Sequence, residues 1–343
     1  MSSFSDLPTE LTTDILATAI PQHPNPSHIL AVNRCFNDIG QFIIYTSLRF
    51  KSESQLTTDA SVKKLLPHSP HSISVRIPGG QGSGVLFEGI KHVFGLCAGA
   101  VGTGILVLDS LEFCLRSHTS DPAPWKIGEA LNLVNPRKFV WTGPDPPHHF
   151  PTVIVPYATY HLFQSIKAWS NLRSLTLTNI SFPSRSTLVP VRNADEAPFL
   201  PLETLTNLRS VYIGQATLVP VRSIAILALA RPKAKHSICK RKGKDIWYHE
   251  QEVEGRDSGL REIRLVDAYK ESIWQERIHR KDLEAVAMEV VSSDVSADPW
   301  YHTPTGEIDS EAVLGRIREI ISCEALTEHI MGGDRAEGMT TLV

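Results

Sequence analysis

The stretch NLRSLTL at residues 171–177 decides the fold, because it returns twice in nearly the same form. The copies are NLRSVYI at 207–213 and GLREIRL at 259–265. In each copy apolar and polar residues alternate, which is typical of a strand with one buried face. The same alternation occurs earlier in SISVRI at 72–77, LEFCL at 111–115 and RKFVWT at 137–142. The sequence therefore predicts six short strands, each with one apolar face.

Helix candidates lie between these strands, at residues 85–95, 125–134, 157–169 and 223–230. The strand centres Phe139, Leu175 and Val211 are 36 residues apart in each step. Strand–helix alternation with a nearly constant period is typical of stacked repeats, none of which can bury its apolar face alone. We therefore predict an α/β fold in which residues 71–330 form an irregular, curved repeat array. An ordinary α/β domain with a doubly wound sheet is the alternative.

The end of the chain has a different pattern. Residues 278–291 and 309–330 are amphipathic, and Asp309 or Ser310 is a suitable N-cap for the second segment. We expect two helices that cap the open end of the array. Residues 331–343 show no periodicity and are predicted to be a flexible tail.

The first fifty residues predict a separate helical module. In DLPTELTTDILATAI at 6–20, Leu7, Leu11 and Ile15 recur at every fourth position, and Leu16 widens this stripe. The prolines at 21–26 should end this helix, and Ser27 is a plausible N-cap for the next one. A module of this size cannot bury a core comfortably alone, so it must pack on the following domain, on a partner, or on both. The polar residues 51–70 are predicted to be a linker with one short helix near 62–66.

The sequence pattern of this module resembles the F-box. The matching residues form the pattern DLPxELxxxIL from Asp6, then LxxxRxF from Leu30, then YxxL from Tyr45, and they cover roughly residues 4–50. The form is similar to that common at the N-terminus of fungal proteins. The later strand–helix units resemble the leucine-rich-repeat folds that follow the F-box in many family members, although the units here are longer and irregular.

The resemblance implies a partner for the helices. In the F-box family they bind the adaptor subunit of a cullin–RING (SCF-type) ubiquitin ligase, while the repeat domain holds a substrate protein. The residues that would contact the adaptor are Leu7, Pro8, Leu11, Ile15, Leu16, Ile29, Val32 and Phe36. The expected role is a non-catalytic substrate-recognition subunit. A repeat scaffold without any ligase partner is a second hypothesis, and an enzyme on an α/β fold is a third.

Composition and charge narrow the class of protein. Of 343 residues 42% are apolar, and 34 Lys and Arg against 37 Asp and Glu give a net charge of −3, so no overall field attracts nucleic acid or an anionic membrane. The first 20 residues contain no Lys or Arg, unlike a signal peptide. The longest uncharged apolar run, 93–108, is too short to span a bilayer. Five scattered cysteines without a CxxC pair favour a reducing compartment, so we expect cytoplasm, nucleus or both.

Motifs that would indicate chemistry are weak. The glycines at 79–84 and 99–104 match no phosphate-binding pattern, and the histidines have no zinc-ligand spacing. We therefore predict no catalytic residue, no metal site and no cofactor. The run at 231–244 holds seven Lys and Arg. A solvated loop is the simplest interpretation, with a nuclear-import signal or a site for an acidic partner as alternatives.

Overall fold

The structure is a computed structural model, and it forms two compact units, Met1–Glu196 and Ala197–Val343. It describes residues 7–58, 69–82, 84–102, 104–117, 123–143, 153–183, 205–230, 259–293, 308–327 and 340–342. The basic run at 231–244 and the helix expected near 62–66 lie outside these ranges. Each unit is described by itself below.

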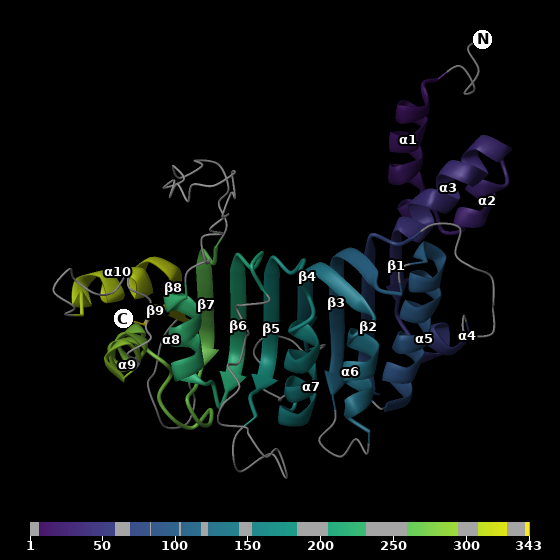
Figure 1. Cartoon of the computed structure of the whole chain (residues 1–343). Helices are drawn as coiled ribbons and strands as arrows, with labels where there is room; N and C mark the ends of the chain where they lie inside the picture. Colours follow the sequence, from purple (N-terminus) through teal and green to yellow (C-terminus); the bar gives the residue numbers. More distant parts are fainter. Residues whose placement is uncertain are drawn as a thin grey trace, which may run out of the picture. The chain divides into compact units, whose positions relative to one another are not determined.

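The first unit begins with three helices, shown in purple and blue in Figure 1: α1 (Thr9–Gln22), α2 (Pro26–Leu30) and α3 (Arg34–Thr46). The predicted first helix is confirmed, but Pro21 lies inside its last turn, where the missing N–H removes only one bond at the helix end. The prediction that Ser27 caps the next helix is wrong, because α2 begins at Pro26 with Asn25 as its N-cap. The Asn33 side chain caps α3 by accepting a hydrogen bond from the Phe36 N–H at 2.8 Å.

The three helices meet around Gly40 of α3. A Cβ at Gly40 would overlap Leu30 Cδ2 of α2 and lie 3.2 Å from Ile20 Cδ1 of α1. Ile20 is buried together with Leu16 and Thr12, one and two turns earlier on the same face of α1. The helices therefore approach closely because position 40 carries no side chain.

The helical module continues directly into the sheet. Strand β1 (Ser47–Phe50) follows α3 without a loop and pairs in parallel with the next strand, with Phe50 opposite Val75. Helix α4 (Glu53–Thr58) then buries Leu56 in contact distance of Gly89. Part of the stretch predicted as a linker is thus packed secondary structure.

The rest of the first unit alternates strands and helices. Its elements are β2 (Ser72–Gly82), α5 (Gly84–Val101), β3 (Leu106–Ser117), α6 (Trp125–Leu131), β4 (Val134–Thr142), α7 (Pro156–Ile166) and β5 (Ser174–Ser181). Every neighbouring pair from β1 to β5 is parallel and the strands stand in chain order. A doubly wound sheet reverses its strand order at a switch point, so the first unit does not fit that alternative. The helices that connect these strands lie on one face of the sheet, where α5, α6 and α7 pack side by side (Figure 1).

Aromatic side chains fill the core beneath these helices. Phe113, Phe139 and Trp141 pack edge to face, with ring centroids 5.5–6.5 Å apart. The buried indole of Trp141 donates to the Leu115 carbonyl at 3.0 Å, so its polar atom is satisfied. The alternation read from the sequence is confirmed here, because the residues between these core positions are exposed or half-buried.

The second unit contains three parallel strands in chain order and one antiparallel edge strand. Its elements are β6 (Ser210–Thr217), α8 (Val221–Leu229), β7 (Glu262–Ala268), α9 (Arg280–Ser293), α10 (Ser310–Ile320), β8 (Ile321–Ala325) and β9 (Thr340–Thr341). Asp309 caps α10 as predicted, accepting from the Ala312 N–H at 3.0 Å. The predicted helix 309–330 is wrong beyond Ile320, where the chain turns into β8. Residues 340–341 pair with β8 although they fall in the stretch predicted as a flexible tail.

The repeated sequence motif produces a repeated backbone conformation. Asn179, Gln215 and Asp267 occupy the same position in β5, β6 and β7, four residues after the first core position of each strand. All three have positive φ angles, of 57°, 48° and 49°. Such angles are uncommon in residues other than glycine, so the three copies share a specific bend as well as an apolar pattern. Overall the chain is α/β, and its described residues include eight strands in parallel pairing.

Candidate partner-binding surface

An apolar row is exposed at the start of the chain. Leu11 and Ile15 lie one turn apart on α1 with 51% and 43% of their surface exposed, and Leu7, two residues before the helix, is 38% exposed. The buried stripe of α1 begins at Thr12, one position or about 100° further round the helix. Helix α1 therefore has two apolar faces, of which one packs on α3 and the other is open to solvent.

The remaining residues predicted to contact an adaptor fall into three groups. Val32, in the connection between α2 and α3, is 63% exposed, and Pro8 is also exposed. Ile29 and Phe36 are half-buried. Leu16 is only 2% exposed, so it belongs to the core between the helices and cannot contribute to a free surface.

One exposed apolar residue was missed by the sequence reasoning. Phe42 of α3 is 46% exposed and is not among the residues predicted to contact a partner. The signal that could have found it is Gly40, which lies on the buried side of α3, since residues two positions apart on a helix point about 200° apart.

The second candidate surface is the uncovered face of the first unit's sheet, which we call the open face. It consists of the strand residues that alternate with the core: Ser47, Arg49, Ser72, Ser74, Arg76, Ser110, Glu112, Cys114, Arg116, Lys138, Val140, Thr142, Ser174 and Thr176. All of them are exposed or half-buried. Half of this set is serine or threonine, so short hydroxyl side chains make up half of the face.

Charged side chains stand above this hydroxyl surface. Glu112 lies between two cations, 3.7 Å from Arg76 and 4.0 Å from Lys138. At the edge where the strands begin, the Asp109 carboxylate accepts from Arg137 at 2.8 Å and lies 3.4 Å from the His71 ring. These pairs are at least one-third exposed, so they contribute little to stability and leave the charges accessible.

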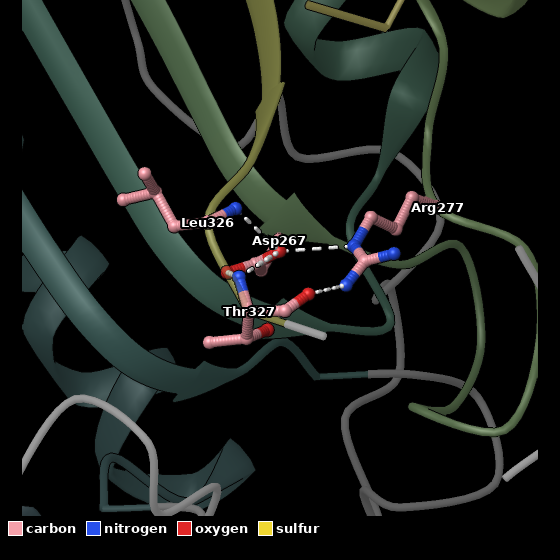
Figure 2. Close-up of polar contacts among 4 residues, drawn as sticks. All are labelled: Asp267, Arg277, Leu326 and Thr327. Carbon is pink, nitrogen blue, oxygen red and sulfur yellow. Dashed lines mark hydrogen bonds and ion pairs between the residues drawn. The ribbon is translucent and has the colours of Figure 1, made fainter. Parts of the chain in front are cut away.

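The second unit holds a buried ionic cluster, drawn in Figure 2. The Arg277 Nε donates to the Asp267 carboxylate at 2.9 Å, and another Arg277 nitrogen donates to the Thr327 carbonyl. The backbone N–H groups of Leu326 and Thr327 also donate to Asp267. Both charged side chains are at most 1% exposed. The cluster connects the end of β7 to the residues that follow β8. Because its charged atoms are inaccessible, it is not a binding site.

A second ion pair in this unit lies on the polar side of the strands. Arg264 makes two hydrogen bonds to Glu324, at 2.8 and 2.6 Å, and its guanidinium lies over the Tyr212 ring. The hydrogen bond from Arg264 lowers the pKa of Glu324, against the opposing effect of partial burial. This pair links β7 to β8 side by side.

The described residues offer little that resembles an active site. The pocket beside α5 has a volume of about 410 Å³ and is lined by Glu88, Lys91, His92, Gly95, Leu96 and Leu133. Its lysine is engaged by Glu129 at 2.8 Å. Within the described part of the chain, no three His, Cys, Asp or Glu side chains gather closely enough to hold a metal ion.

A search of the described helices finds none with the length and apolar character needed to cross a bilayer. No model of a known protein family matches the sequence, and no curated protein matches it.

Proposed function

We propose that this protein is the substrate-recognition subunit of a cullin–RING (SCF-type) ubiquitin ligase. The α1–α3 helices bind the ligase adaptor, and through it the cullin scaffold, while the strand–helix region, acting as a leucine-rich-repeat-like array, holds the substrate protein. Catalysis belongs to other subunits. The contribution of this chain is proximity, since it raises the effective concentration of a substrate lysine near the charged conjugating enzyme. Such a role fits the cytoplasm or the nucleus.

The observation that carries this proposal is the open apolar row of α1. Fully burying one leucine or isoleucine contributes about 1.5–3 kcal/mol, so burial of this row against another polypeptide would be strongly favourable. The helical module does not bury this row, because α3 packs on the other face of α1, which carries Thr12, Leu16 and Ile20. The row coincides with the residues of the F-box resemblance, which indicates the adaptor as the partner.

The test is co-purification of the adaptor with a charged variant. Leu7→Asp with Leu11→Asp places two carboxylates in the proposed apolar interface and should abolish adaptor recovery. Both positions are exposed, so the variant should fold, which circular dichroism will check. The matched control is Val85→Asp with Trp125→Asp, at exposed apolar positions in the first turns of α5 and α6, where carboxylates are tolerated. Full adaptor recovery by the folded α1 variant would refute the proposal.

A repeat scaffold without a ligase partner is the second candidate. It is favoured by the continuous passage from α3 into β1, because the helices then serve as the N-terminal cap of the sheet. A pull-down from native lysate distinguishes the two functions. A ligase subunit would recover adaptor and cullin, whereas a scaffold would recover neither.

A further inference from the structure

The open face of the first unit carries a charge opposite to that of the whole chain. The cations of the set that defines it are Arg49, Arg76, Arg116 and Lys138, and the carboxylate of that set is Glu112. The edge pair of Asp109 and Arg137 adds one charge of each sign and leaves the balance unchanged. Four cations against one anion leave +3, whereas the chain as a whole has a net charge of −3. A local excess of this kind attracts acidic partners and repels basic ones.

The arrangement of these cations indicates the form of the partner. They stand one to a strand on β1, β2, β3 and β4, four neighbours in the sheet. Across the strands the set spans about 14 Å, because parallel strands lie about 4.8 Å apart. Arg49 lies opposite Ser74 and Arg76 opposite Cys114, so Arg49, Arg76 and Arg116 form a diagonal over β1–β3, whereas Lys138 lies opposite Ser110 on the row of serines. A phosphate group is only about 3 Å across and is normally held by cations that converge on it. Cations separated in this way, three on a diagonal and one beside it, match several carboxylates spaced along an extended chain instead.

The short side chains between the cations allow such a chain to approach. Ser72, Ser110, Lys138 and Ser174 face one another in a continuous cross-strand row, and Ser47 extends it to β1. Apart from the Ser110 hydroxyl, which is buried, these hydroxyl groups can donate or accept hydrogen bonds with the backbone of a peptide laid across them. Arg76 and Lys138 share Glu112, and their side chains are 68% and 52% exposed, so their charges are accessible.

We propose that the open face binds an acidic segment of a partner protein, rich in Asp and Glu and held in an extended conformation across β1–β4. This inference deepens the proposed function. It rests on that function in one respect, namely that the partner is taken to be the ligase substrate. The carboxylates of the segment pair with the diagonal of arginines and with Lys138, and its backbone lies over the serines beside them.

The test uses the full chain and fluorescence anisotropy with a labelled (Glu-Gly)6 peptide. A (Gln-Gly)6 peptide and a glycine–glutamine peptide with one phosphoserine serve as comparison probes. We expect the Glu peptide to bind, its affinity to fall as salt rises from 50 to 300 mM, and the Gln peptide to bind at least tenfold more weakly. Equal binding of the Glu and Gln peptides would overturn the inference, as would no binding of the Glu peptide. Tighter binding of the phosphoserine peptide than of the Glu peptide would replace the acidic segment with a phosphorylated one.

The site is located by a pair of charge-matched variants. Arg49→Gln, Arg76→Gln and Lys138→Gln together should weaken Glu-peptide binding at least tenfold. Changing Lys91, Lys126 and Lys167 to Gln, on the helical side, alters the net charge equally and should leave binding within twofold. Equal loss in both triple variants would show non-specific attraction and refute the site. Adaptor co-purification is measured on the same samples, so a failure of peptide binding is distinguished from a failure of the adaptor interface.

Discussion

Removing the guanidinium from the buried cluster of Figure 2 should destabilise the second unit strongly. In Arg277→Met the Asp267 carboxylate keeps its bonds from the Leu326 and Thr327 N–H groups but loses its only charged partner among the described residues. Breaking a buried ion pair on one side costs about 3–5 kcal/mol, and the remaining backbone bonds favour the lower end of that range. At a slope of about 2 kcal/mol per molar urea, the unfolding midpoint should fall by about 1.5 M.

The assay is equilibrium urea unfolding of the full chain, followed by circular dichroism and tryptophan fluorescence. Lys270→Met is the control, because it removes a lysine that is half exposed and bonded to Asp282 at 2.9 Å, which should cost no more than about 1 kcal/mol. The double variant Asp267→Asn with Arg277→Met leaves no unpaired buried charge, keeps an acceptor for the two backbone N–H groups and should recover part of the loss. A midpoint shift in Arg277→Met no larger than in the control would refute the reasoning.

Three further predictions concern other parts of the chain. Gly40→Val should lower the free energy of unfolding by about 1–3 kcal/mol, because its side chain overlaps those of α1 and α2, and a thermal melt within 1 °C of wild type would contradict this. Because Arg264 lowers the pKa of Glu324, this carboxylate stabilises the fold above its unfolded pKa near 4.5 and loses that contribution as pH falls through its lower folded pKa; urea titrations should therefore show Glu324→Gln less stable than wild type at pH 7, with a smaller difference at pH 3. Burial raises the pKa of Cys97 to about 12, so at pH 8 a thiol reagent should modify the exposed Cys35 and spare Cys97 in the folded protein, as read by peptide mass spectrometry.

The strands were predictable because the alternation of apolar and polar residues and the repetition of the motif both indicated strands at the same positions. The motif copies at 171, 207 and 259 all became parallel strands. The four helices predicted between strands correspond to α5, α6, α7 and α8, although α5 ends six residues later than predicted. Strand β8 was missed because Ile317, Ile320 and Ile321 continue the helical spacing of α10. The alternation of Ile321, Cys323 and Ala325 was present, but a five-residue pattern cannot outweigh a longer helical one without knowledge of the neighbouring strand.

The site was predictable only in part. The sequence identified the apolar residues of α1, but hydrophobic spacing cannot tell a face that packs on the chain itself from a face left for a partner. Leu16 and Leu11 differ in this respect only because α3 lies on one side of α1. The open face depended even more on the structure, since Arg49, Arg76 and Lys138 are far apart in sequence and come to lie on one face only through the strand register.

The strict chain order of β1 to β5 has a consequence for how this protein can change over evolutionary time. Each strand contacts only the units before and after it in the chain. Duplication or loss of one strand–helix segment would therefore leave the other pairings intact, as nearest-neighbour architectures permit. The width of the sheet, and with it the length of partner it can span, is a property that descendants of this gene can alter stepwise without rebuilding the core.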